Sequence, residues 1–240
     1  TLEAAIASID RPAAARIARS VVTSLDAYAA GWGEVHADAC ASDDDLGVRF
    51  AQLRCLDRGR IELDALMKAL RQADVAVLEH AEDAVRGLPQ PNACVTPGWR
   101  DTTAAEPPEA IREEVERLQV DFEVANAYLA TGQYALAVEH ARAVVEASRT
   151  LGHAPLVIDA LLVQSEAEST LGHRDDARAS LRTAWAEAIR SNDPRSQLRV
   201  ASTMIDVVGN GQQERDDGQF WVDVARAALD GVEDEDPAVW

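Results

Sequence analysis

The sequence predicts an all-α protein in which an antiparallel N-terminal helical bundle precedes a right-handed α-solenoid of helix-turn-helix repeats. Apolar residues recur at spacings of three and four over long stretches, whereas strand-like alternation of β-branched and aromatic residues is scarce. In the second half of the chain, turn-forming residues also return after about 40 residues, which is typical of a repeat architecture. With 240 residues, of which 47% are hydrophobic, the chain can bury a sizeable core in one or two domains.

Residues 10–88 are predicted to form a three-helix antiparallel unit. Asp10 and Pro12 resemble a helix start, the polar run at 42–45 separates two apolar stripes, and Asp74 is expected to cap a third helix. The first stripe comprises Ile17, Val21, Leu25, Tyr28, Trp32 and Val35, and the second comprises Leu46, Phe50, Leu53, Leu56, Leu63, Met67 and Leu70. Both stripes are expected to face the core.

A proline-rich segment at 89–108 is predicted to be a linker, and residues 109–240 are predicted to form the repeats. Gly132 and Gly172 are separated by one such period. The spacings between Pro155, Pro194 and Pro237 are similar. The predicted units are about 109–152, 153–192 and 193–232, with the start of a fourth at 236.

Repeating units of this kind bury their apolar faces by stacking on one another. Each glycine is expected to end the first helix of its unit in a left-handed cap, because the turn that follows is short. Ala137 and Ala177 are expected to lie where the two helices of a unit cross closely.

These residues resemble the tetratricopeptide repeat. In the first predicted repeat, at 109–152, the residues that carry the resemblance are Ala125, Tyr128, Gly132, Tyr134, Ala137 and Ala141. In the second predicted repeat, Gly172 and Ala177 match, but Glu168 and Arg174 stand where tyrosines are expected. The third unit is degenerate, with Gly218 and Ala225 as its clearest matches. The resemblance implies a surface that binds a protein or peptide.

A second resemblance spans residues 10–240. The residues that carry it are Arg11-Pro12, Ala27-Tyr28-Ala29-Ala30-x-Trp32, Asp38-Ala39-Cys40, Arg54-Cys55-Leu56-Asp57-Arg58, Leu88-Pro89, Cys94, Leu151-Gly152-His153-Ala154-Pro155-Leu156-Val157 and Val207-Val208-Gly209. This order resembles the region C-terminal to the catalytic domain in myxobacterial-type serine/threonine protein kinases. The run at 42–47 departs from the family pattern. The resemblance implies an extracytoplasmic position, with membrane contact only through a segment outside this chain, which starts without Met and is interpreted as a fragment.

The chain has three cysteines, Cys40, Cys55 and Cys94, which allow at most one internal disulfide. No pair has the spacing of a zinc or thioredoxin-like site, and buried reduced thiols are an alternative interpretation. The extracytoplasmic position that the second resemblance implies favours a disulfide. Because Cys94 follows the third predicted helix, it could reach either of the other two, and a bridge that includes Cys94 is favoured.

The sequence contains none of the motifs of kinases, P-loop proteins, Rossmann folds or zinc proteases, so we expect no catalytic residue, metal or cofactor in this chain. A formal net charge of −19 argues against nucleic acid as a partner.

The candidate binding groove is expected on the first helices of the units. Its residues are Gln119, Phe122, Asn126, Asp159, Leu162 and Glu166. Asp159 and Glu166 make it acidic, which favours a basic or neutral peptide. The second resemblance implies that the chain is a non-catalytic sensor or scaffold region of a membrane-anchored kinase, acting through a peptide ligand or through self-association. The alternative is a cytoplasmic tetratricopeptide adaptor.

Overall fold

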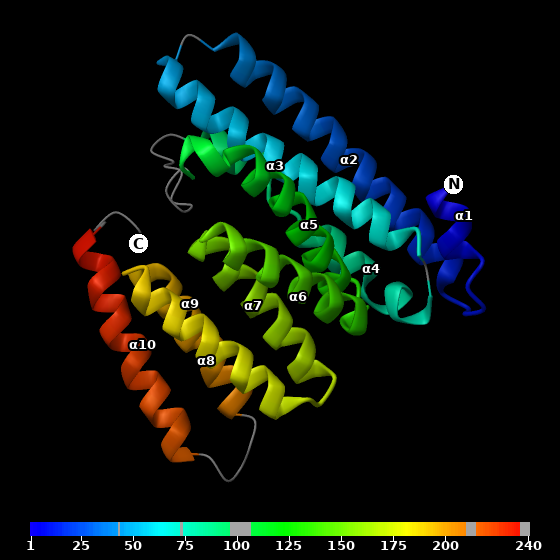
Figure 1. Cartoon of the computed structure of the whole chain (residues 1–240). Helices are drawn as coiled ribbons and strands as arrows, with labels where there is room; N and C mark the ends of the chain where they lie inside the picture. The colour runs from blue at the N-terminus through cyan, green and yellow to red at the C-terminus, as the bar shows by residue number, and fades with distance from the viewer. Residues whose placement is uncertain (43, 73, 97–106, 210–214, 236–240) are drawn as a thin grey trace. The chain divides into compact units, whose positions relative to one another are not determined.

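The computed structural model describes residues 1–42, 44–72, 74–96, 107–209 and 215–235 (Figure 1). In these ranges it contains ten α-helices, two short 3₁₀ helices and no strand, which confirms the all-α prediction. The chain divides into two compact units, one comprising Thr1–Ala105 with Ala130–Gln133 and the other comprising Glu106–Leu129 with Tyr134–Trp240.

The first unit consists of five helical elements. They are α1 (Leu2–Ala7), α2 (Ala14–Ala41), α3 (Leu46–Leu70), α4 (Val75–Arg86) and the 3₁₀ helix η1 (Pro91–Val95). The long helices α2 and α3 run antiparallel, and α4 packs mainly against α2 (Figure 1). Asp45 caps α3 by accepting a hydrogen bond from the Gly47 amide at 2.8 Å. Asp74 caps α4 in the same way through the Val77 amide, at 2.9 Å.

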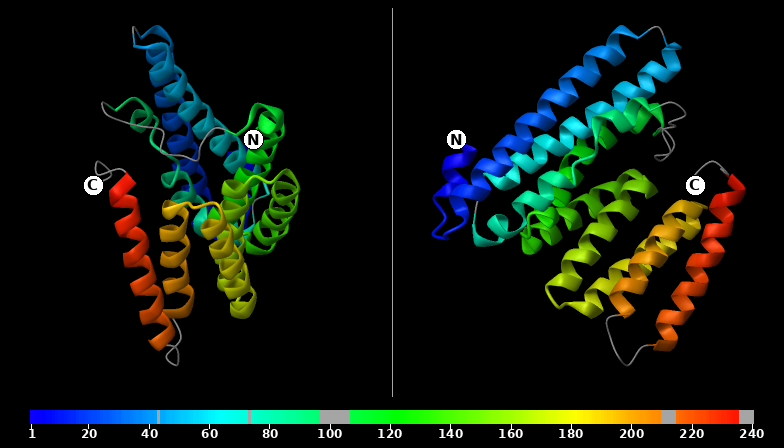
Figure 2. Two further views of the ribbon diagram at one scale, coloured as in Figure 1. Left: turned by 60° about the vertical axis from the view of Figure 1, so that its left-hand side comes forward. Right: turned by 180° about the vertical axis from the view of Figure 1, so that it is seen from behind.

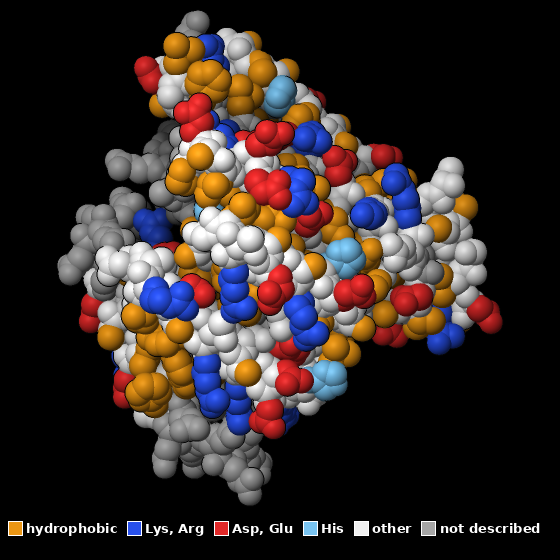
Figure 3. All heavy atoms as spheres, in the orientation of Figure 1, with side chains coloured by type: hydrophobic (Ala, Val, Ile, Leu, Met, Phe, Trp, Pro, Cys, Tyr) orange, Lys and Arg blue, Asp and Glu red, His pale blue; other side chains and the backbone are white. Residues whose placement is uncertain are grey.

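Within the segment predicted as a linker, Pro91–Val95 forms η1. Two predictions for this unit are wrong. Asp10 and Pro12 do not open the first long helix, which begins at Ala14, and the sequence does not predict α1. Leu46 and Phe50 do not face the core, because they are 59% and 65% exposed. The 12-residue α4 is too short to cover the whole α2–α3 hairpin, so among the described residues of this unit no third helix lies along the first turns of α3 (Figure 1). In Figure 3, hydrophobic side chains gather over this end of the hairpin.

The second unit starts with the 3₁₀ helix η2 (Glu109–Ile111) and continues as six α-helices. They are α5 (Arg112–Ala130), α6 (Tyr134–Leu151), α7 (Ala154–Thr170), α8 (Arg174–Arg190), α9 (Pro194–Gly209) and α10 (Arg215–Glu235). From α6 onward each helix packs against the next, and α7 also packs against α9. Figure 2 shows α7 to α10 side by side from two further directions. The second helices of the repeats meet through Trp185 of α8 and Trp221 of α10, whose rings lie edge to face at 5.5 Å.

The turns that join α5 to α9 are evenly spaced along the chain. Gly132, Gly152, Gly172 and Asn192 have positive φ angles of 76°, 70°, 85° and 51°. In the last three turns, the amide of the following residue donates to a carbonyl five residues earlier, as in a Schellman cap. Gly132 and Gly172, which indicated the repeat in the sequence, therefore mark alternate turns of this series. Asn192 has the left-handed conformation that Asn tolerates better than most residues.

Gly218, which resembles the repeat signature in the third predicted repeat, lies inside α10. The expected loop beyond residue 209 and the expected fourth unit at 236 lie outside the described residues.

Candidate functional site

The first helices of the repeats, α5, α7 and α9, share one register. Equivalent positions of α7 and α9 have the same burial, as the pairs Ala160 and Val200, and Gln164 and Met204, show. Side chains at equivalent positions therefore point in corresponding directions. Positions that keep solvent contact on all three helices form two rows, with Gln119, Asp159 and Arg199 in one and Asn126, Glu166 and Asp206 in the other. Between these rows lie the equivalent positions Phe122, Leu162 and Ser202.

An ion pair shows that α7 and α9 bring equivalent positions together, because the Arg199 guanidinium donates to the Asp159 carboxylate at 2.6 Å. In the other row, partial desolvation and then the negative charge of Asp206 raise the pKa of Glu166. A positively charged group near Glu166 and Asp206 would relieve this repulsion.

The structure separates the six predicted groove residues into two sets. Leu162 is only 9% exposed and belongs to the core of the unit, and Phe122 packs against that core. The prediction that Leu162 faces a groove is therefore wrong, whereas Phe122 is half-buried and keeps part of its surface in solvent. Gln119, Asn126, Asp159 and Glu166 keep solvent contact. Of these, Gln119 donates its amide to Glu123 at 2.8 Å.

A buried polar cluster surrounds Glu168, and no motif in the sequence indicates it. This side chain is 2% exposed and accepts hydrogen bonds from Gln164 and Ser180, both at 2.8 Å. The Arg142 guanidinium lies 3.6 Å from the same carboxylate. A buried carboxylate needs such partners to offset its lost hydration. Only the replacement of the expected tyrosine by Glu168 signalled that this position is unusual.

The helix pair α5–α6 has different side chains at the positions that Glu168 and Ser180 occupy in α7 and α8. Tyr128 and His140 occupy the positions equivalent to Glu168 and Ser180, and their rings lie 5.1 Å apart. Both helix pairs have a turn glycine with positive φ and a fully buried alanine, Ala137 in one and Ala177 in the other. The backbone turns are therefore alike, whereas the buried side chains between the helices differ.

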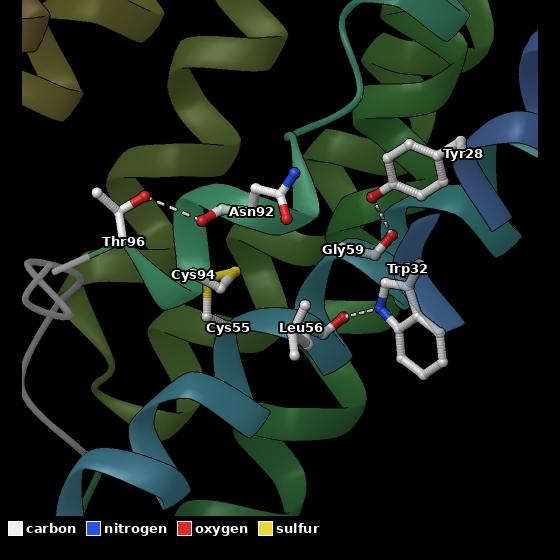
Figure 4. The surroundings of a disulfide bond; sticks show 8 residues. All are labelled: Tyr28, Trp32, Cys55, Leu56, Gly59, Asn92, Cys94 and Thr96. Carbon is white, nitrogen blue, oxygen red and sulfur yellow. Dashed lines mark hydrogen bonds between the residues drawn. A yellow bond between two sulfur atoms is a disulfide. The ribbon is translucent and has the colours of Figure 1, made fainter. Parts of the chain in front are cut away.

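A second notable region is the junction of α2, α3 and η1 in the first unit. The structure brings Cys55 of α3 and Cys94 of η1 to disulfide distance, with their Cα atoms 5.7 Å apart (Figure 4). Of the two partners that the sequence left open for Cys94, the structure selects Cys55. Cys40 is exposed and outside the bridge, with its Sγ 3.9 Å from Nδ1 of His36.

Side-chain hydrogen bonds to the α3 backbone tie α2 to this junction. The Trp32 indole donates to the Leu56 carbonyl at 2.7 Å, and the Tyr28 hydroxyl donates to the Gly59 carbonyl at 3.5 Å (Figure 4). Burial, and then the charge of Glu62, raises the pKa of Tyr28 to about 12. The Thr96 hydroxyl donates to the Asn92 carbonyl at 3.0 Å and closes the end of η1.

Over the described residues, no group of three or more His, Cys, Asp or Glu side chains is arranged to hold a metal ion. None of the helices in that part of the chain combines the length and apolarity needed to cross a membrane. No known protein family, curated protein or solved structure matches this chain.

Proposed function

We propose that this chain is a non-catalytic protein-binding region whose repeat array holds an extended, basic peptide segment across α5, α7 and α9. The observation that supports the proposal most directly is the alignment of equivalent polar side chains on one face of α7 and α9, seen in the Asp159–Arg199 pair and in the effect of Asp206 on Glu166. An extended chain can meet one helix after another along such a row. The array is then a tetratricopeptide-like solenoid.

The charge of the face supports a basic partner. Arg199 is already engaged by Asp159, whereas Glu166 and Asp206 repel each other. A lysine or arginine side chain placed between them would lower the free energy of both carboxylates. Asn126, half-buried at the corresponding position of α5, can offer its amide to the backbone of the same peptide.

The binding test uses a fluorescein-labelled octapeptide of alternating alanine and lysine, with a glutamate version as its counterpart. Saturable binding of the lysine peptide in fluorescence polarisation at physiological salt is expected. Glu166→Gln with Asp206→Asn should weaken it about tenfold, which corresponds to about 1.4 kcal/mol. The matched control is Glu139→Gln with Glu146→Gln, which removes the same charge from exposed positions of α6. Equal losses in both double variants would mean that the net charge of −19 attracts the peptide unspecifically.

We further propose that the region belongs to a membrane-anchored serine/threonine kinase and lies on the extracytoplasmic side. The pair Cys55–Cys94 fits this location, because disulfides persist mainly in oxidising compartments. The alternative is a cytoplasmic adaptor. Thiol titration of the protein isolated from its native compartment separates the two, with one reactive thiol expected from the first location and three from the second. A coding sequence upstream of Thr1 without a kinase domain would contradict the attachment to a kinase.

A further inference from the structure

The first unit contains a solvent-open cavity of about 450 Å³ between α2, the end of α4 and the segment leading into η1. Its volume falls within the usual range of small-molecule sites, roughly 300 to 1,000 Å³. On α2 the cavity is lined by small side chains at successive turns of one face. They are Ser20, Ser24, Ala27 and Gly31. Because α2 has 28 residues and α4 only 12, part of this face is left uncovered.

The cavity wall carries one charge of each sign. Glu82 and Arg86 lie one helical turn apart on α4, and both line the cavity. They are paired with other groups, Glu82 with Arg16 at 3.3 Å and Arg86 with Asp83 at 2.5 Å. These partners hold the two side chains without using their full hydrogen-bonding capacity, since a carboxylate accepts several bonds and a guanidinium has five donors.

The rest of the lining combines apolar and neutral polar groups. Val21, Val35, Val85 and Pro91 supply apolar surface, and Gln90 and Asn92 supply amide groups. With formal charges that sum to zero, the cavity favours a neutral molecule or a zwitterion over a net ion. Opposite charges on adjacent turns match a molecule that carries an ammonium group and a carboxylate group a few bonds apart.

One wall of the cavity is fixed by the disulfide. Pro91 and Asn92 belong to η1, whose Cys94 is bonded to Cys55 of α3 (Figure 4). Residues 87–90 connect this helix to α4 without regular structure. Reduction would therefore free the wall that carries the two amides, while the α2–α3 contacts through Trp32 and Tyr28 remain.

We propose that this cavity binds a small zwitterion, a free amino acid or a dipeptide with an apolar side chain, whose ammonium group pairs with Glu82 and whose carboxylate pairs with Arg86 while the disulfide is intact. The site is separate from the peptide-binding face of the repeats. Either proposal can therefore fail without the other.

The first experiment screens the common amino acids and a set of apolar dipeptides such as Ala-Leu by thermal shift and isothermal titration calorimetry. At least one is expected to raise Tm and to bind with a one-to-one stoichiometry. Its N-acetyl and amide derivatives, which lack the ammonium and the carboxylate respectively, should bind at least about tenfold more weakly. No binding by any member at millimolar concentration, or equal binding of the capped derivatives, would overturn the proposal. The separate amino-acid and dipeptide arms identify the natural size of the ligand.

The second experiment locates the site. Glu82→Gln and Arg86→Gln should each weaken binding at least about tenfold, whereas the matched variants Glu79→Gln on α4 and Arg19→Gln on α2, at exposed positions outside the lining, should not. Ser24→Leu fills the cavity without changing any charge and should abolish binding, with circular dichroism reporting that the helices remain. Reduction with dithiothreitol should weaken binding at least about fivefold in the wild type. Unchanged affinity in the Ser24→Leu variant would place the ligand elsewhere, and unchanged affinity after reduction would contradict the dependence on the disulfide.

Discussion

The first unit joins its helices through contacts that occur once, whereas the repeats use one kind of contact again and again along their length. In the first unit, the Cys55–Cys94 pair and the bonds from Trp32 and Tyr28 to the α3 backbone have no counterparts at a regular interval. Along the repeats, four evenly spaced turns each carry a residue with a left-handed backbone. Individual contacts can shape an irregular body with a cavity, and repeated contacts give a face on which equivalent side chains align.

The largest effect is expected when the disulfide between Cys55 and Cys94 in the first unit is removed. Replacing both Cys55 and Cys94 by Ser opens a loop with a sequence separation of 39 and should lower the free energy of unfolding by about 4 kcal/mol, because the unfolded chain regains the entropy of loop closure. Urea denaturation monitored by circular dichroism measures the loss. Cys40→Ser, which removes an exposed thiol outside the bridge, should change stability little. Similar stability of the double variant and the wild type would show that the pair is not bonded.

The next largest effect is expected at Glu168, the buried carboxylate that replaces the tyrosine found at the equivalent position of α5. Glu168→Ala leaves the Gln164 amide and the Ser180 hydroxyl without their buried acceptor, and should lower the free energy of unfolding by about 3 kcal/mol. Glu166→Ala, two residues away on the more exposed side of α7, is the control and should not destabilise the protein. A loss under about 1 kcal/mol for Glu168→Ala would mean that the cluster contributes little to folding.

A smaller effect tests the repeated turn itself. Gly172→Ala places a side chain at φ 85° and should cost about 1 kcal/mol, since no neighbouring atom lies within 4 Å and only the backbone conformation opposes it. Gly33→Ala, in the exposed middle of α2 and equally free of neighbours, should instead stabilise by up to about 1 kcal/mol through helix propensity. Chemical denaturation of the two variants should therefore shift in opposite directions. Shifts of the same sign would contradict the role given to the left-handed turn.

The smallest effect concerns pH and the aligned face. Folding raises the pKa of Glu166 above its ordinary value of 4.5, so the ionised carboxylate opposes folding above the raised pKa and this penalty disappears as the pH falls below 4.5. Glu166→Gln removes the penalty. Its Tm should exceed that of the wild type at neutral pH, and the difference should vanish in acid below the ordinary pKa. A difference in Tm that is independent of pH would show that the carboxylate charge is not its cause.

Much of the helical pattern could be predicted because it depends on local interactions. The caps at Asp45 and Asp74 and the turns at Gly132 and Gly172 act within a few residues, through side-chain acceptors and left-handed backbone conformations. The helix start expected at Asp10 was wrong, because α2 begins at Ala14 without any side-chain cap. At Asn192 the sequence offered a capping Asp193 but no glycine to mark the turn.

The candidate sites could be predicted only in part. The repeat period placed Asp159 and Glu166 on the same face, but it could not show that Leu162 turns into the core or that Arg199 and Asp206 complete the rows. The cavity in the first unit left no signal beyond small residues on one face of α2, since its existence depends on how far α4 extends along α2.

The sequence by itself therefore determined most of the helices, the turns at Gly132 and Gly172 and the spacing between them, because these follow from hydrogen bonding and backbone preferences between near neighbours in the chain. Only the tertiary structure decided the partner of Cys94, the burial of Glu168 and the exposure of Leu46 and Phe50. Each of these depends on which distant segment covers a given helix face and where that cover ends. Side-chain periodicity indicates that a face is apolar, but the length and position of the neighbouring helix decide whether that face is buried.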